Sequence, residues 1–466
     1  MTHPHLDLVV VGGGVAGLTI ALDAARGGMR VALREAGDAL GGMLRRADLD
    51  GVAVDVGAES FATRTTGVAD LIADAGLDLR IVEPAPGGAH LAALADGEVL
   101  RAPLPRRTVL GIPADPEADD VVRILGAEGA AQAAAERVLP RSARPGEPEP
   151  SLHDLVAGRC GAVLAQRLVD PLCRSVYSVP AASVRLSRLN PALWDAHLRH
   201  GSLIAAAAEL ASPARAGAAV AGIEGGMWRL AAALEHAARD LGADLRTGSP
   251  VRALEPTTYG VGVVLDDEVL RAPRVVVATG ANAARALLGV DPVAVPPVHV
   301  AAALVDSAGL DAHPVGSGVI VAADVPAAAK ALTHTSAKWA WAGRSDGRHL
   351  LRLSARDDAA GLAAPADIAR EVSLLTGVRI AESDVVAVSR TTWTDAVPAA
   401  PVDTDRRSAL AAAGIVLAGA AVAGTGLASV IPHARAVARD LLAPLTPLTP
   451  DVAPDGPAAP APRRNP

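Results

Sequence analysis

The chain has 466 residues, of which 50% are hydrophobic and 20% are charged, a composition typical of a soluble globular protein. Its formal net charge of −8 argues against a general nucleic-acid binder, and its 2% of aromatic residues leaves little material for an aromatic cage. The length exceeds what one compact core normally holds, so we expect about two or three interleaved subdomains.

The cysteines and the apolar runs bear on the cellular compartment. Cys160 and Cys173 fit no CxxC or zinc-ligand spacing, so we expect buried thiols, a reduced cytoplasmic setting and no bound metal. No secretory signal is expected, because the first apolar run leads directly into glycines. The longest apolar run, residues 410–431, is interrupted by glycines and ends at Pro432, which favours a buried strand, a turn and a helix over a membrane span. Loose contact with a membrane surface stays open.

The N-terminal segment has the pattern of a βαβ unit. Residues 6–11 form an apolar run typical of a buried parallel strand, residues 15–26 have helical character, and residues 30–35 form a second strand. Between the first strand and the helix lies a G-x-G-x-x-G pattern formed by Gly12, Gly14 and Gly17. This arrangement predicts the tight turn, the close backbone approach and the helix–strand packing of a dinucleotide-binding loop.

An acidic residue follows at the expected distance. Glu35 ends the second predicted strand, about 20 residues after the glycine loop, where a carboxylate can hold a ribose hydroxyl. These features predict a dinucleotide site, but by themselves they fit NAD as well as FAD.

The remaining elements are predicted from periodicity in chain order. Helical patterns cover residues 65–80, 151–211 and 227–243, and strand patterns cover 244–246, 250–254 and the start of 274–289. The last of these strands is expected to re-enter the first sheet. Residues 297–395 mix strands and helices, and the Pro/Ala-rich tail 444–466 is expected to be disordered.

Together these patterns predict an α/β fold, with a doubly wound Rossmann-type FAD-binding domain, an α+β substrate domain and a helical subdomain. The expected FAD-binding segments are residues 1–85, 212–295 and 396–443, the substrate and helical segments are 86–211 and 296–395, and the tail is 444–466.

Two segments distinguish FAD from NAD. "AGDALGGMLRR", residues 36–46, carries Gly41 and Gly42 soon after the ribose acid, and it resembles the second phosphate-side motif of the amine-oxidase-like flavoproteins. Residues 414–442 resemble the closing FAD motif of the same superfamily, in which a helix N-terminus can aim backbone N–H groups at the flavin. The resemblance implies FAD. We expect non-covalent binding, because no cysteine follows Cys173.

Segments between these motifs resemble the bacterial porphyrinogen oxidases, and in particular the actinobacterial coproporphyrinogen III oxidases, over about residues 6–442. The segments that carry the resemblance are 54–77, 103–116, 167–191, 316–339 and 349–356. The resemblance implies oxidation of coproporphyrinogen III to coproporphyrin III in haem biosynthesis, with hydride passing to FAD and oxygen reoxidising it. The implied partners are the porphyrinogen, molecular oxygen and other haem-pathway enzymes.

The resemblance also implies site residues. The cofactor-binding set is Gly12, Gly13, Gly14, Val15, Ala16, Gly17, Glu35, Ala36, Gly41, Gly42, Gly57, Ala58, Glu59, Ser60, Val251, Trp393, Gly419, Ala420, Thr425, Gly426 and Leu427. The candidate substrate-pocket residues are Arg64, Arg174, Tyr177 and Lys338, each with a plain structural role as its alternative. No catalytic side chain is assigned, because the hydride passes to the cofactor.

The sequence departs from the family pattern near the substrate. Ser175 replaces a usual glycine, Ala400 replaces a usual tyrosine, and Ala428-Ser429 replaces a Pro-Asp type pair. These departures keep three alternatives open: a protoporphyrinogen IX oxidase, an FAD amine oxidase and a non-catalytic FAD- or porphyrin-binding paralogue. The oligomeric state is not legible in the sequence.

Overall fold

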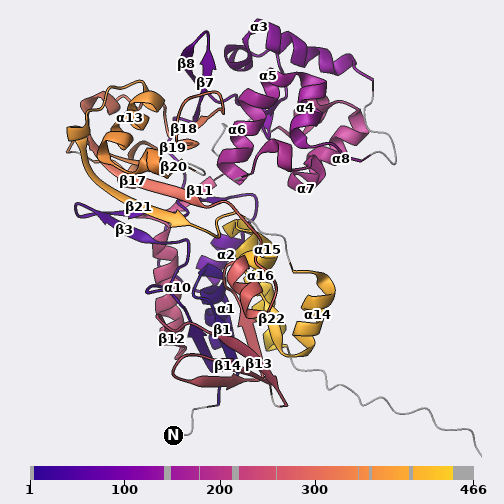
Figure 1. The fold of residues 1–466 in the computed structure, drawn as a ribbon, viewed down its shortest axis with the longest axis vertical. Coiled ribbons are helices and arrows are strands. Elements are labelled where there is room, and N and C mark those ends of the chain that lie inside the picture. The colour runs from indigo at the N-terminus through magenta and orange to yellow at the C-terminus, as the bar shows by residue number, and fades with distance from the viewer. Residues whose placement is uncertain are drawn as a thin grey trace, which may run out of the picture.

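The computed structural model describes residues 5–140, 148–177, 179–211, 220–258, 260–344, 346–355, 359–397 and 402–443. In the lower part of Figure 1, near the N-terminus, lies one sheet with its helices, and in the upper part a larger sheet lies beside a helical body. Residue Ala400 and the tail 444–466 lie outside the described residues.

The first sheet is parallel and buried on both faces. Its strands, in spatial order, are β12 (Asp244–Arg246), β2 (Val31–Arg34), β1 (Leu8–Val11), β16 (Arg274–Val277) and β22 (Ile415–Leu417). The continuous Val/Leu run of β1 is fully buried, as expected for a parallel strand covered on both sides. The predicted doubly wound α/β fold is therefore present, and β16 re-enters this sheet beside β1.

Different layers cover the two faces of this sheet. The helices on one face are α1 (Val15–Arg26), α10 (Trp228–Asp240) and α16 (Leu427–Leu442), and the antiparallel strands on the other are β13 (Ala253–Thr257), β14 (Gly260–Val264) and β15 (Val269–Ala272). The strand expected at 250–254 is thus shifted and belongs to the covering layer. Residues 255–257 of β13 are exposed, so the end of this strand has no pattern of buried residues from which it could be predicted.

The larger sheet has seven strands from distant parts of the chain. In spatial order they are β21 (Val385–Trp393), β17 (Val298–Asp306), β20 (Arg348–Ala355), β19 (Ala331–His334), β18 (Gly318–Val321), β7 (His90–Ala95) and β8 (Glu98–Pro103). Helix α13 (Pro365–Thr376) packs on one face of this sheet. The hairpin of β3 (Arg46–Leu49) and β4 (Val52–Asp55) packs on the other face.

The helical body packs beside the larger sheet (Figure 1). Its helices are α3 (Asp119–Ala135), α4 (Leu152–Cys160), α5 (Ala162–Leu164), α6 (Asp170–Leu172), α7 (Leu186–Leu189), α8 (Pro191–His200) and α9 (Leu203–Leu210), with π-helical turns η2 (Ala165–Val169) and η3 (Cys173–Tyr177). Cys160 and Cys173 are free and buried here, and burial raises the pKa of both thiols, so neither is a ready nucleophile.

Short elements connect these bodies. They are β5 (Phe61–Ala62), α2 (Gly67–Asp74), β6 (Ile81–Val82), β9 (Thr108–Val109), β10 (Ile112–Pro113), β11 (Val220–Ile223), α11 (Ala281–Leu287), α12 (Thr335–Lys338), α14 (Thr404–Ala412) and α15 (Ala420–Ala423). The apolar run 410–431 contains β22, α15 and the start of α16, which confirms the strand, turn and helix. Among the described residues, every helix is too short or too polar to span a bilayer.

Candidate functional site

A cavity of about 730 Å³ lies at the carboxyl edge of the five-stranded sheet. Residues that directly follow three of its strands line the cavity: Gly12 after β1, Glu35 after β2 and Ala278 after β16. Doubly wound sheets bind ligands at this edge, and the volume falls within the range of roughly 300–1,000 Å³ seen for small-molecule and cofactor sites.

Most of the predicted cofactor-binding residues line this cavity. They are Gly12, Gly14, Val15, Ala16, Glu35, Ala36, Gly41, Gly42, Ala58, Val251, Trp393, Ala420, Thr425 and Leu427. The predicted residues outside its lining are Gly13, Gly17, Gly57, Glu59, Ser60, Gly419 and Gly426. The chain therefore gathers segments from both of its ends around one space.

The three glycines of the first loop have three different surroundings. Gly12 has a φ of 105°, and a Cβ there would lie 2.9 Å from the backbone of Ala278. A Cβ on Gly17 would lie 1.9 Å from the carbonyl oxygen of Gly12, so this glycine lets α1 pack on β1. A Cβ on Gly14 would meet no described atom within 4 Å. The open space beside Gly14, at the N-terminus of α1, fits a pyrophosphate that approaches the backbone closely.

The second glycine pair packs directly on the first loop. Gly41 N–H donates to the carbonyl oxygen of Gly13 over 2.8 Å, and a Cβ on Gly42 would lie 3.1 Å from the Cα of Gly14. Both residues have positive φ, 107° for Gly41 and 56° for Gly42, which glycine adopts without strain. The two loops thus form one cradle made mainly of backbone.

Glu35 connects the cradle to the sheet. One of its carboxylate oxygens accepts a hydrogen bond from Gly13 N–H over 2.6 Å, and the other accepts from Gly37 N–H over 2.7 Å. The carboxylate also borders the cavity, and each oxygen keeps a second lone pair. Its predicted role toward a ribose stays a prediction.

The opposite wall is formed by the end of β21 and the segment after β4. Trp393 Nε1 donates to the carbonyl oxygen of Val56 over 2.8 Å. A Cβ on Gly57 would lie 1.8 Å from the carbonyl oxygen of Met43, so this glycine permits a close crossing of two backbone segments. Gly57 also accepts a hydrogen bond from Arg352 of β20. Gly57 therefore lies outside the lining and packs against the residues that form this wall.

The closing segment supplies a second helix N-terminus. Ala420, Thr425 and Leu427 line the cavity, and α16 begins at Leu427 without a side-chain cap on its first N–H groups. Uncapped N–H groups at a helix start favour a negative charge or an acceptor group nearby. Both α1 and α16 thus begin at the cavity.

Lys338 and Glu59 form a buried ion pair, with 2.5 Å between Lys338 Nζ and Glu59 Oε1. Their side chains are 14% and 10% exposed. Burial by itself raises the pKa of Glu59, but the positive charges of Lys338 and Arg352 outweigh it, so that the pKa is lowered. The structure therefore places Lys338 outside the cavity lining, where it holds Glu59 in position.

Arg64 and Tyr177 belong to two different bodies and lie close enough for the charge of Arg64 to act on Tyr177. Arg64 is exposed in the loop after β5, and its Nη2 donates to Ser429 Oγ of α16 over 2.9 Å. Tyr177 lies at the end of η3 in the helical body and is 37% exposed. Burial raises the pKa of Tyr177, and the nearby charge of Arg64 opposes that shift. Ser429, one of the departures from the family pattern, is therefore the residue that anchors Arg64.

Arg174 is also on η3 but is already paired. Its Nε lies 2.5 Å from Asp170 Oδ2, and the other oxygen of Asp170 accepts from Ala181 N–H over 2.9 Å. The carbonyl oxygen of Arg174 accepts from Lys330 Nζ over 3.2 Å. Of the four substrate candidates, the structure brings Arg64 and Tyr177 together, ties Arg174 to its own helix and separates Lys338.

Sequence reasoning missed several residues of this region. The strand end Ala278-Thr279-Gly280 lines the cavity, and so do Thr392, Thr394 and Asp395 on either side of the predicted Trp393. Asp55, the half-buried last residue of β4, accepts from the N–H groups of Met227 and Trp228, and its desolvation raises its pKa to about 6. The Ala-Thr-Gly that ends a predicted sheet strand was a usable signal, whereas Asp55 and Asp395 follow no motif.

Three histidines meet outside the cavity, although no metal was expected. His313, His334 and His349 each place a ring nitrogen within 4.8 Å of the others. Burial and the two neighbouring imidazoles lower the pKa of His334 to about 3, so this ring is neutral at neutral pH.

Comparison with known proteins agrees with the geometry of the cavity. The family model of flavin containing amine oxidoreductases matches residues 15–442. The chain is 34% identical to the coproporphyrinogen III oxidase of Mycobacterium tuberculosis over 362 residues, which are 74% of this chain and 75% of that protein. It is 33% identical to the Mycobacterium leprae protein of the same name over 409 residues, 84% of this chain and 87% of that protein.

Solved structures show the same fold. A protein from Exiguobacterium sp. 255-15, provisionally described as a protoporphyrinogen oxidase, superposes with a TM-score of 0.79 at 22% identity, over 94% of this chain and 99% of that one. The family match begins at Val15, the first residue of α1, and covers the second glycine loop and the closing α16 segment, all of which line the cavity. The chain therefore belongs to the flavin containing amine oxidoreductase family.

Proposed function

We propose that this protein is an FAD-dependent oxidase that converts coproporphyrinogen III to coproporphyrin III in haem biosynthesis, with molecular oxygen as the final electron acceptor. The observation that carries the proposal is the cavity at the carboxyl edge of the parallel sheet, walled by two glycine loops and two helix N-termini. The curated relatives that span most of the chain carry this activity in their name.

The residues around the cavity suit FAD. The space beside Gly14 and the first turn of α1 would hold the pyrophosphate, and Glu35 would hold the ribose. Val251 lies on the wall predicted for the adenine, and the N-terminus of α16 on the wall predicted for the flavin ring. Neither cysteine belongs to the lining, which supports non-covalent binding.

Bound FAD would supply the hydride acceptor, so the protein itself has to bind the porphyrinogen, orient it and keep water away. Arg64 is the charged side chain best placed to bind a propionate carboxylate, because it is exposed and held by Ser429 beside the first turn of α16. Tyr177 would form the facing wall on the helical body. A guanidinium binds carboxylates through charge-assisted hydrogen bonds, which restrain the ligand geometrically as well as attracting it.

The amine oxidase alternative has less support in the described lining, where Trp393 is the only aromatic residue. A cation-binding aromatic cage would need several. The free cysteines agree with a reduced cytoplasmic location, which is part of the proposal together with contacts to other haem-pathway enzymes.

The proposal is tested by incubating the purified flavin-loaded protein in air with coproporphyrinogen III and, in parallel, with protoporphyrinogen IX. Porphyrin fluorescence should rise faster than in a protein-free control, and faster with coproporphyrinogen III. Equal rates with and without protein would contradict the oxidase and favour a non-catalytic paralogue. A clear preference for protoporphyrinogen IX would move the assignment to that substrate. Acid precipitation should release the flavin into the supernatant, whereas flavin in the pellet would indicate covalent attachment.

A further inference from the structure

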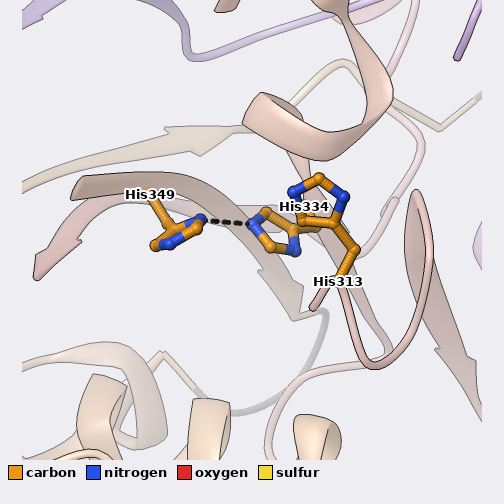
Figure 2. Close-up of side chains that lie close together, drawn as sticks. All are labelled: His313, His334 and His349. Carbon is orange, nitrogen blue, oxygen red and sulfur yellow. Dashed lines mark hydrogen bonds between the residues drawn. The ribbon is translucent and has the colours of Figure 1, made fainter. Parts of the chain in front are cut away.

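A histidine cluster lies on the α13 face of the seven-stranded sheet, outside the cofactor cavity. His334 ends β19, His349 is the second residue of β20, and His313 lies between η5 (Ala308–Leu310) and β18. Figure 2 shows the three rings turned toward one another from these separate segments. Along β20, His349 shares a face with Leu351 and Leu353, which pack with α13, while Arg352 on the other face reaches Gly57. The cluster therefore lies on the side of the sheet that faces away from the cavity wall.

The geometry of the cluster is close to that of a shared ligand site. His334 Nε2 and His349 Nδ1 are 3.0 Å apart, and one ring nitrogen from each of the three residues lies within 4.8 Å of the others. The rings of His313 and His334 meet edge to face, with centroids 5.1 Å apart. A tetrahedral zinc ion with Zn–N bonds of about 2.0–2.1 Å requires nitrogens roughly 3.3–3.4 Å apart, which small movements of these rings can reach.

Burial gives a second, independent indication. His334 is 0% exposed, and its Nδ1 has no hydrogen-bond partner among the described residues. A buried polar nitrogen without a partner is costly, and a cation bound at this Nδ1 would satisfy it. His349 is also buried, at 6% exposed, whereas His313 is exposed and leaves the site open on one side.

Asp311 supplies the outer contact typical of metal-binding histidines. Its Oδ1 lies 3.0 Å from His349 Nε2, so it accepts the proton of that nitrogen and leaves the lone pair of Nδ1 directed at His334. Histidine ligands commonly donate their second N–H to a carboxylate in this way, which fixes the tautomer and the orientation of the ring.

We propose that His313, His334 and His349 bind one divalent transition-metal cation of the zinc class, with Asp311 as the outer-shell partner and water in the open fourth position. Three imidazoles without a thiolate suit zinc and its neighbours in the first transition series. The ion would link the segment after η5 to β19 and β20. The backbone N–H of His334 already donates to the carbonyl oxygen of Ser317 in that segment over 3.0 Å. Its role would be structural, because the site lies on the α13 face and outside the cofactor cavity.

The test uses the full flavin-loaded chain, freed of any affinity tag and treated with a chelator. Calorimetric titration with Zn²⁺ should give one bound ion per chain, and Co²⁺ should produce the visible absorption bands of a tetrahedral site. His313→Asn should weaken Zn²⁺ binding by more than roughly 100-fold, and Asp311→Asn by roughly 10–100-fold. His236→Asn is the matched control, because His236 is exposed on α10, and it should leave binding unchanged.

The asparagine variant is chosen because residue 313 has a positive φ of 47°, which Asn tolerates, so the fold should be kept. Unchanged flavin content and far-ultraviolet circular dichroism would show this independently of catalysis. Zn²⁺ should raise the melting temperature of the wild type and not that of His313→Asn. The proposal is overturned if the wild type binds no Zn²⁺ at micromolar concentration, or if His313→Asn binds it as tightly as the wild type.

Discussion

Gly14 and Gly42 offer only backbone to the cofactor cavity, whereas Arg64 and Tyr177 offer long side chains to the face between the cofactor-binding and helical bodies. The first region depends on places where a side chain must be absent: a Cβ would lie 2.9 Å from the Ala278 backbone at Gly12 and 1.9 Å from the Gly12 carbonyl oxygen at Gly17. The second depends on exposed side chains that can change without disturbing a fold. This difference explains why the departures from the family pattern leave the glycines of both loops in place, whereas Ser175, Ala400 and Ala428-Ser429 differ on the substrate side.

The strongest test of this division concerns Lys338, which sequence reasoning assigned to the substrate side. Lys338→Met should destabilise the protein by about 3–5 kcal/mol, because it leaves the Glu59 carboxylate buried without its partner. Urea unfolding measures this change. The double variant Lys338→Met/Glu59→Leu should recover most of the loss. If Lys338→Met were as stable as the wild type but had a raised KM, Lys338 would contact the substrate instead.

The glycine loop gives a matched pair of identical substitutions. Gly17→Ala should cost about 3 kcal/mol, because its Cβ would lie 1.9 Å from the Gly12 carbonyl oxygen. Gly14→Ala should change stability by less than about 0.5 kcal/mol, since its Cβ meets no described atom within 4 Å. It should nevertheless weaken FAD binding by about tenfold, or about 1.4 kcal/mol, in a fluorescence titration of the apoprotein. If Gly14→Ala bound FAD as tightly as the wild type, the pyrophosphate would not bind beside Gly14.

The pH dependence of stability tests the environment of Asp55, which ends β4 and is held by the N–H groups of Met227 and Trp228. Its folded pKa of about 6 lies above the ordinary value of 3.8, so the folded state binds a proton more tightly than the unfolded state. Stability should therefore fall as the pH rises from about 4 to about 6, by up to about 3 kcal/mol. Asp55→Asn should remove this part of the pH dependence when urea unfolding is measured across that range. The same slope in both proteins would show that Asp55 does not titrate in this way.

The smallest expected effect is that of Arg64→Ala, which tests the proposed contact between Arg64 and the substrate. Loss of one charge-assisted hydrogen bond should raise the KM for coproporphyrinogen III by about tenfold, while flavin content and stability stay near those of the wild type. Arg26→Ala, on the exposed end of α1, is the control. An unchanged KM would leave Arg64 as a surface residue held by Ser429.

The sequence predicted the backbone-built cofactor region better than the region on the substrate side. The bounds of α1 are those of the predicted helix 15–26, because a glycine loop and a terminal Gly27-Gly28 pair mark both ends. Strands β7 and β8 were missed although they form a local hairpin, and its Asp96-Gly97 turn, in which both residues have positive φ, was a usable signal. The pairing of β7 with β18, more than 200 residues later, has no local signal. The pairing of Lys338 with Glu59 was missed for the same reason, since the two residues are 279 positions apart. The domain bounds, the substrate residues and the individual cofactor contacts stay predictions.

Anaerobic mixing of the flavin-loaded protein with coproporphyrinogen III tests the central claim most directly, because it joins the cofactor cavity to the proposed substrate in one step. The visible flavin absorbance should be lost on mixing and return when oxygen is admitted, while porphyrin absorbance grows in proportion. A flavin that stays oxidised while the same preparation binds the porphyrinogen would contradict this claim.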